Sequence, residues 1–278
     1  MKRGPEELYL DLIKKTLSFV LWQEPPIPAV TFNYERSPAK RFLISTISGM
    51  LKLTTKELEL AQRRCFTPEE KSEGHVWPGY AETMIGLRRL DNLQECIVSV
   101  LDEDIKGDLI ETGVWRGGAC IFMRAVLAAH GVADRRVFVA DSFEGLPKPD
   151  AEKYPADKGD LHHIHKVLAV TQEEVEYNFS KYGLLDEQVV FLKGWFKDTL
   201  PKAPIDKLSI LRLDGDMYGS TMDALDSLYP KLQTGGFCII DDYVLPGCRQ
   251  AVGDYRARFS INATLKEIDR SSTYWRKE

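Results

Sequence analysis

The chain has 278 residues, of which 44% are hydrophobic and 28% are charged, and its net charge at pH 7 is −5. This composition is typical of a globular α/β protein, and the negative charge argues against binding to nucleic acid or to an anionic membrane. No apolar run approaches the roughly 18 residues that span a bilayer, and early acidic residues interrupt any signal peptide. The five cysteines form no CxxC pair, so we expect reduced thiols in a cytoplasmic protein.

Residues 1–90 alternate short helical patterns with proline-rich breaks and show no convincing strand. Leu8, Leu12, Leu17 and Val20 recur at helical spacing, which predicts an amphipathic first helix. We therefore expect a helical cap over residues 1–90 that contacts the acceptor and supports a homodimer or a higher homo-oligomer.

Residues 91–278 have a different pattern, in which apolar runs of strand length alternate with helical stretches. This alternation predicts a doubly wound parallel sheet whose ligand crevice lies at the carboxyl ends of the strands. The predicted strands cover residues 108–112, 136–141, 189–192, 208–213 and 237–240, and the predicted helices cover 119–129, 172–182, 221–232 and 249–259. Residues 264–268 and 273–275 favour an antiparallel hairpin at one edge. The long polar segment 142–170 is a candidate lid.

The first predicted strand ends in a glycine-rich turn, Glu111 to Gly118. Glycines allow a tight turn and let a ligand approach the backbone N–H groups at a helix N-terminus. The spacing E-x-G-x-x-x-G-G departs from the dinucleotide pattern G-x-G-x-x-G, and an acid at the strand end would repel a pyrophosphate. The turn therefore favours a nucleoside with a cationic tail, although a purely structural turn is the alternative.

A second carboxylate, Asp141, ends the next strand. An acid at this position of a nucleotide-binding fold can accept both ribose hydroxyls. Asp141 could instead cap the following turn through Ser142.

Two further acidic clusters follow strands, Asp214 with Asp216 and Asp241 with Asp242. In a parallel sheet both clusters would converge on the same crevice, where they would repel one another without a cation. Oxygen ligands suit Mg²⁺, which could lower the pKa of a substrate hydroxyl while a spare carboxylate takes its proton. The alternative is that these aspartates only cap helices and turns.

Aromatic residues follow the third strand in the segment Gly194, Trp195, Phe196. They could pack on an adenine ring, and core packing is an equal alternative for Trp195. The lid histidines His162, His163 and His165 lack the spacing of a metal motif, so we expect solvated loop residues.

Taken together, these motifs resemble the macrocin O-methyltransferase family from about residue 73 to the C-terminus. The motifs that carry the resemblance are Ala81 to Leu90, Glu111 to Gly118, Asp141 to Leu146, Gly194 to Leu200, Leu213 to Asp216 and Asp241 to Gln250. The resemblance implies a Rossmann-like class I methyltransferase that uses S-adenosylmethionine (SAM) and Mg²⁺ on a hydroxyl of a natural product, often a deoxysugar on a macrolide. One departure is Gly219, where many relatives are expected to carry an acid.

The resemblance also implies roles for individual residues. Asp214, Asp241 and Asp242 would be the metal ligands, and Asp216 the general base, so that Asp216 and Asp214 are the expected catalytic residues. The expected cofactor-binding residues are Thr83, Met84, Glu111, Gly113, Val114, Trp115, Asp141, Ser142, Phe143, Gly194, Trp195 and Phe196.

Three alternatives compete with the interpretation as a sugar O-methyltransferase. The acceptor could be a phenol or another polyol. An oxidoreductase that uses NAD could share the sheet, although the missing G-x-G-x-x-G pattern counts against it. A non-catalytic SAM-binding protein would have no use for the full carboxylate set, because clustered like charges destabilise a fold.

Overall fold

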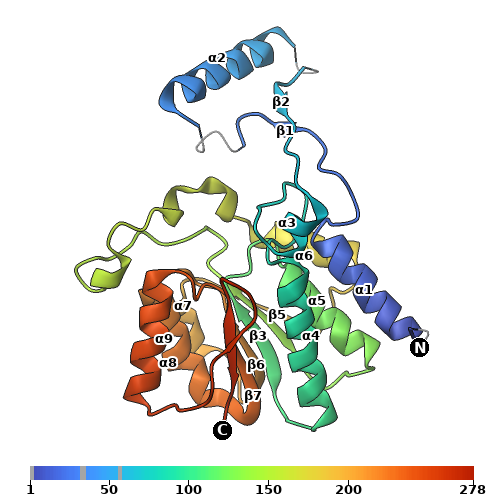
Figure 1. Cartoon of the computed structure of the whole chain (residues 1–278), viewed down its shortest axis with the longest axis vertical. Helices are drawn as coiled ribbons and strands as arrows, with labels where there is room; N and C mark the ends of the chain where they lie inside the picture. The colour runs from blue at the N-terminus through green and yellow to red at the C-terminus, as the bar shows by residue number, and fades with distance from the viewer. Residues whose placement is uncertain (1–2, 32–35, 56–57) are drawn as a thin grey trace.

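The computed structural model describes residues 3–31, 36–55 and 58–278. Its centre is a seven-stranded sheet in the order β5-β4-β3-β6-β7-β9-β8 (Figure 1). The strands are β3 (Asp108–Thr112), β4 (Val137–Asp141), β5 (Val189–Lys193), β6 (Leu208–Leu213), β7 (Leu232–Ile240), β8 (Lys266–Glu267) and β9 (Thr273–Arg276). Strands β3 to β7 are parallel, whereas β9 pairs antiparallel with β7 and with β8. The predicted doubly wound α/β sheet and its edge hairpin are therefore confirmed.

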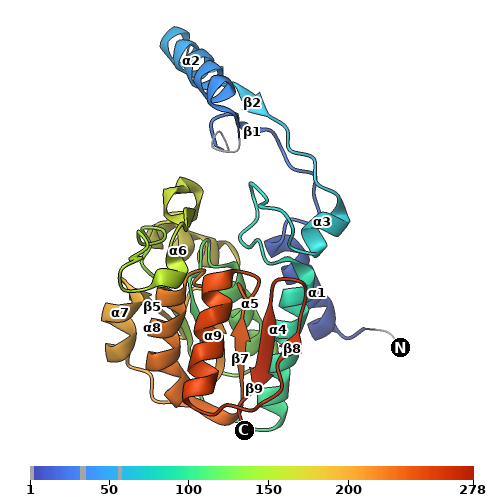
Figure 2. The same cartoon turned by 60° about the vertical axis from the view of Figure 1, so that its left-hand side comes forward.

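Helices cover both faces of the sheet (Figures 1 and 2). On one face lie α1 (Pro5–Leu17), α4 (Gly86–Asp102), α5 (Gly118–Ala129) and α6 (Gln172–Lys181). On the other face lie α7 (Phe196–Thr199), α8 (Tyr218–Leu228) and α9 (Pro246–Arg258). No helix among the described residues is both long and apolar enough to cross a bilayer.

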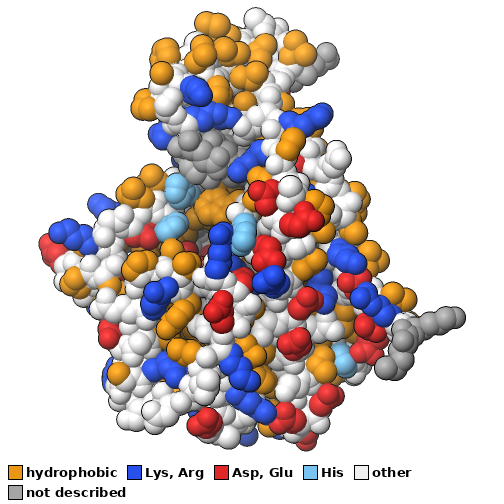
Figure 3. Space-filling view, in the orientation of Figure 1, with side chains coloured by type: hydrophobic (Ala, Val, Ile, Leu, Met, Phe, Trp, Pro, Cys, Tyr) orange, Lys and Arg blue, Asp and Glu red, His pale blue; other side chains and the backbone are white. Residues whose placement is uncertain are grey.

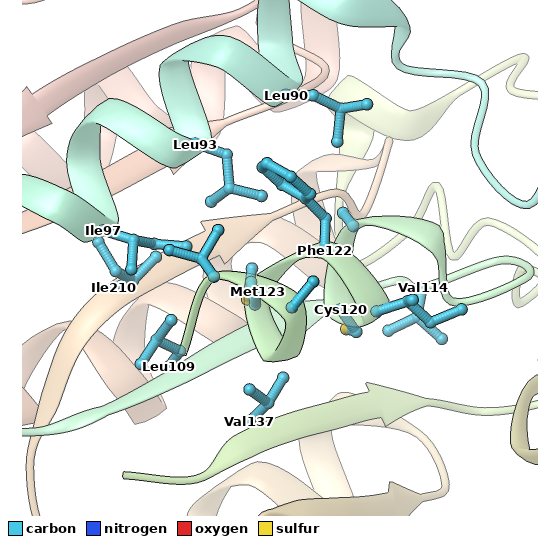
Figure 4. Packing of buried hydrophobic residues seen from close by; sticks show 14 of the residues in the cluster. Leu90, Leu93, Ile97, Leu109, Val114, Cys120, Phe122, Met123, Val137 and Ile210 are labelled. Carbon is cyan, nitrogen blue, oxygen red and sulfur yellow. The ribbon is translucent and has the colours of Figure 1, made fainter. Parts of the chain in front are cut away.

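The alternation of side chains along the strands divides the core into two layers. Leu109 and Ile210 face α4 and α5, and Figure 4 shows them in one cluster with Leu93 and Ile97 of α4 and Met123 of α5. Their neighbours Ile110 and Leu211 belong to the layer under α8 and α9. Side chains of a strand alternate between the two faces of the sheet, and helices cover both faces here. Each of these strands is therefore a nearly continuous run of hydrophobic residues.

Two helices from the first hundred residues are part of this core. Leu10, Ile13 and Leu17 of α1 are buried in the same layer as Leu93 of α4. Helix α4 continues without a break across residues 90 and 91. The central sheet is therefore packed against two helices that begin before residue 91, α1 at Pro5 and α4 at Gly86.

An arm extends away from this body. It consists of α2 (Pro38–Thr54) and the antiparallel pair β1 (Ile27–Pro28) and β2 (Ala61–Gln62), and α3 (Pro68–Ser72) follows it. The expectation of no strand in residues 1–90 is therefore wrong, although each strand has only two residues. Figure 3 shows the exposed hydrophobic side chains of the arm at the top of the view.

Candidate active site

A cavity of about 510 Å³ opens at the carboxyl ends of β3, β4, β6 and β7. Crossovers that alternate between the two faces of a parallel sheet leave a crevice at this edge. Most of the site residues expected from the sequence line it, namely Thr83, Met84, Glu111, Gly113, Val114, Trp115, Asp141, Ser142, Trp195, Phe196, Asp214, Asp216, Asp241 and Asp242. Two expected cofactor contacts, Phe143 and Gly194, do not line the cavity.

Gly113 makes the tight turn after β3 with a positive φ of 84°. A Cβ atom at this position would lie 1.7 Å from the backbone oxygen of Asp214. Only glycine fits there, because any side chain would push β3 and β6 apart. The turn expected to hold the cofactor therefore lies directly against the acidic cluster that follows β6.

Asp141 organises the same turn from the end of β4. Its carboxylate accepts hydrogen bonds from the backbone N–H groups of Val114 and Phe143, both at 2.8 Å. Burial nevertheless raises the pKa of Asp141 above its ordinary value, and these backbone hydrogen bonds oppose the rise. Asp141 Oδ1 also accepts a hydrogen bond from Ser142 Oγ at 3.4 Å. Asp141 therefore caps the turn, as the alternative interpretation expected, and still faces the cavity.

Glu111 lies at the cavity floor and is buried. It accepts hydrogen bonds from the guanidinium of Arg212 and from Cys120 Sγ, the latter at 3.0 Å. Burial raises the pKa of Glu111 to about 7, although the positive charge of Arg212 lowers it. An acid with these contacts could receive an ammonium group.

Asp214, Asp241 and Asp242 form the expected acidic cluster at the ends of β6 and β7. One carboxylate oxygen from each lies within 4.8 Å of the others. Burial and then the charge of Asp241 raise the pKa of Asp214 to about 6. Burial also raises the pKa of Asp242 well above its ordinary value, as do its acidic neighbours. These three residues fit a divalent cation, because all donors are hard oxygens and the ion would relieve their repulsion.

Asp216 faces the cavity beside this cluster but is not one of its three members. Its backbone has a positive φ of 56°, which is uncommon for aspartate, and its N–H donates to Asp242 Oδ2 at 3.0 Å. Burial and then the charge of Asp214 raise the pKa of Asp216 to about 7. A carboxylate with a pKa near neutrality is suited to accept a proton.

The segment 142–170 lies over the cavity and is anchored at several points. Asp157 accepts hydrogen bonds from the N–H groups of Tyr218 at 2.6 Å and Gly219 at 3.0 Å, so it caps the N-terminus of α8. A Cβ atom at Gly219 would lie 2.7 Å from the ring of Tyr154. Gly219, where the resemblance implies an acid in many relatives, is therefore where the lid packs onto α8.

One lid histidine, His162, faces the cavity and keeps 31% of its side chain exposed. His162 lines the cavity, and its Nδ1 lies 2.7 Å from Asp160 Oδ2. The histidine spacing gave no signal for this position.

Phe143 lies apart from the cavity because of its backbone. It has a positive φ of 58° and packs in the core beside Phe191. Gly194 also has a positive φ, of 136°, and its N–H donates to the backbone oxygen of Asp141 at 2.9 Å. Gly194 thus supports the end of β4 from outside the cavity.

Two arginines near the acidic cluster were not expected from the sequence. Arg212 of β6 forms ion pairs with Glu111, Asp214 and Asp241. Arg89 of α4 pairs with Asp241 and with Asp269, both at 2.7 Å. Arg212 lies inside an apolar strand run, and Arg89 is 152 residues before Asp241, so no local pattern indicates either contact.

The parallel sheet, the glycine turn after β3 and the acid at the end of β4 define a Rossmann-like class I methyltransferase fold. The structure titled calicheamicin methyltransferase CalS11 shares it, with a TM-score of 0.56, 18% identity and coverage of 87% of this chain and 93% of that one. At that level of identity the likeness shows the fold alone.

The family model described as Macrocin-O-methyltransferase (TylF) matches residues 6–277. The chain belongs to this family and is an O-methyltransferase, which confirms the resemblance drawn from its motifs. A tetracenomycin-glycoside 4'-O-methyltransferase of Streptomyces olivaceus is 47% identical over 99% of this chain and 95% of its own length. The mycinamicin III 3''-O-methyltransferase of Micromonospora griseorubida is 45% identical over 98% and 96%. The structure of the O-methyltransferase NovP has a TM-score of 0.83 at 45% identity and covers 98% of this chain and 99% of that one.

Proposed function

We propose that this enzyme transfers a methyl group from SAM, with Mg²⁺, to a sugar hydroxyl of a glycosylated natural product. The names of two relatives support the acceptor class, since one names the 4'-O position of a rhamnosyl tetracenomycin C and the other the 3''-O position of mycinamicin III. The observation that carries the proposal is that one cavity joins the Gly113 turn to the cluster of Asp214, Asp241 and Asp242. A methyl donor and a cation held there would meet the same acceptor oxygen.

When bound, SAM supplies a methyl group on a sulfonium and Mg²⁺ stabilises negative charge on an oxygen. Glu111 would receive the ammonium of the cofactor, and Asp141 the ribose hydroxyls. Asp214, Asp241 and Asp242 would hold the ion, and Asp216 would accept the proton that the acceptor hydroxyl loses when it is methylated, with S-adenosylhomocysteine as the other product. The main contribution of the protein would be the alignment of the two reacting groups and the exclusion of water by the lid.

The substitution Asp242→Asn tests the metal role. Asp242 is the cleanest choice, because Asp241 also pairs with two arginines. We expect turnover to fall at least about 100-fold, with the affinity for S-adenosylhomocysteine (SAH) within about threefold of wild type. The matched control is Asp226→Asn on α8, which pairs with Arg258 at the surface, and it should change neither quantity. Equal loss of SAH affinity and turnover would instead mark Asp242 as a structural residue.

The acceptor class needs a separate test. A panel of deoxysugar glycosides, phenols and simple polyols, assayed for transfer of isotope-labelled methyl from SAM, should show turnover only with glycosides. Turnover of phenols or simple polyols alone would replace the acceptor in the proposal. SAH binding without turnover of any acceptor would favour a non-catalytic SAM-binding protein.

We also propose that residues 1–90 help to hold the acceptor and that α2 joins copies of the chain into a homodimer or a higher homo-oligomer. Several apolar side chains of α2 are exposed, including Phe42 at 76%, Met50 at 61% and Leu53 at 88%. A surface helix that leaves this much apolar area in water is typical of an interface. Light scattering of the wild type and of Met50→Asp with Leu53→Asp should show an oligomer that the double substitution dissociates, whereas a monomeric wild type would contradict this proposal.

A cytoplasmic location completes the proposal. Its support is that all five cysteines are free thiols, of which only Cys65 is exposed. Thiols persist in a reducing compartment. Fractionation of the producing cells should recover the enzyme with cytoplasmic markers, and recovery with the medium or the membrane would contradict this location.

A further inference from the structure

Arg212 is a charged residue at the centre of the sheet, and its side chain is 1% exposed. Its Nη1 donates to Glu111 and, at 2.9 Å, to Asp214 Oδ2, while its Nη2 donates to Asp241 Oδ1. One guanidinium therefore contacts a residue proposed to bind the cofactor and two residues proposed to bind the metal ion. No step of the proposed reaction uses Arg212 directly.

The sheet register explains this arrangement. Glu111 of β3 is paired with Arg212 of the neighbouring strand β6, and Arg212 is paired with Ile239 of β7. Asp241 follows Ile239 by two residues, so its side chain points to the same face of the sheet. The three charged groups therefore lie in a row, with Arg212 in the middle.

Arg89 lies at the end of this row, beside Asp241. Its Nη1 donates to Asp241 Oδ2 and its Nε to Asp269 Oδ2, both at 2.7 Å. Asp269 is itself held by the N–H groups of Ser271 and Ser272 at 2.8 and 2.9 Å. Both oxygens of Asp241 thus accept from arginine, which fixes the orientation of that carboxylate.

The charge of Arg212 is strongly favoured by its surroundings. Burial lowers the pKa of Arg212, but Asp241, Glu111 and Asp214 more than offset this and raise it well above its ordinary value. A buried cation is costly unless it is paired. Conversely, removal of Arg212 would leave Glu111 buried without this guanidinium partner and would leave Asp241 with Arg89 as its remaining arginine partner.

We propose that Arg212 is a positioning residue shared by the cofactor and metal sites, a role that rests on the proposed function. It orients Glu111 toward the cation of the cofactor, and it aligns Asp214 and Asp241 as metal ligands. Residues that orient metal ligands commonly contribute about 10–100-fold to metal affinity. Here one residue supports two different ligands through different carboxylates.

The test measures the dissociation constants of SAH, by calorimetry, and of Mn²⁺ alone, by electron paramagnetic resonance. We expect Arg212→Met to weaken both by at least about tenfold, and Arg212→Lys, which keeps the charge, to lose less. The control Arg124→Met removes another buried arginine, which pairs with Asp186 at 2.6 Å away from the cavity, and should leave both constants within about twofold.

A double-mutant cycle separates positioning from general damage to the fold. In a Glu111→Gln background, Arg212→Met should cost SAH affinity no more than about threefold further, because its partner for the cofactor is already neutral. Arg212→Met in this background should still weaken Mn²⁺ binding at least about tenfold, because Asp214 and Asp241 lose their contact with Arg212. The double variant also removes opposite charges together, so it keeps the test available if Arg212→Met alone does not fold.

Two results would overturn this role. One is a folded Arg212→Met protein that keeps both dissociation constants within about threefold of wild type, and the other is an equal loss of SAH affinity with and without Glu111→Gln. Failure of the proposed function is distinguishable, because wild type would then bind neither SAH nor Mn²⁺.

Discussion

The substitution Gly113→Ala probes the contact between the glycine turn and the acidic cluster. Alanine at a φ of 84° costs about 1–2 kcal/mol of backbone strain. Its Cβ would also lie 1.7 Å from the backbone oxygen of Asp214, so the ends of β3 and β6 must separate. The hydrogen bonds Gly113 N–H to Ala140 O and Asp214 N–H to Thr112 O, both 2.9 Å, would weaken, at about 1 kcal/mol each. We therefore expect a loss of about 3–4 kcal/mol in the free energy of unfolding.

The matched control for this prediction is Gly131→Ala. Gly131 also has a positive φ, of 64°, but nothing lies within 4 Å of a Cβ atom placed there. It should cost only the strain, about 1–2 kcal/mol. Urea unfolding followed by circular dichroism measures both variants. If the two lose the same free energy within about 0.5 kcal/mol, the argument for close contact between the turn and the cluster is wrong.

Two further predictions concern the lid and the metal cluster. Gly219→Asp places a side chain where Tyr154 packs on α8. It should raise the KM for the acceptor at least about tenfold, while SAH affinity stays within about twofold. An unchanged KM would show that the lid does not need this contact. Mn²⁺ affinity should rise with pH through about 6, since the pKa of Asp214 is raised to about 6 and its proton must leave before a cation binds. Titrations at about pH 5.5 and 7.5 check this, and equal affinities at both would contradict a role for Asp214 as a ligand.

The acidic residues of the site could be predicted because each follows an apolar strand run. Parallel strands bring their carboxyl ends to one edge, so Asp141, Asp214 and Asp241 were expected in one crevice before any contact was known. The strands themselves were found from continuous apolar runs, which a sheet covered on both faces requires. The predicted helices agree with the structure within a few residues at each end.

The missed features depend on contacts between distant segments. Arg89 and Asp241 are far apart in the sequence, and nothing local in α4 indicates that this arginine is buried. The contacts of Asp157 also join distant segments, because its partners are two N–H groups of α8. Phe143 points into the core because its φ is positive. A positive φ is uncommon for phenylalanine, so the sequence does not predict it.

The most direct test of the account is a calorimetric titration of the folded protein with SAH in Mg²⁺ and again in EDTA, with NAD as the comparison ligand. We expect micromolar binding of SAH and no binding of NAD. Absence of SAH binding by folded protein would mean that the Gly113 turn and Asp141 serve only the fold, and it would contradict the proposed use of SAM at this cavity.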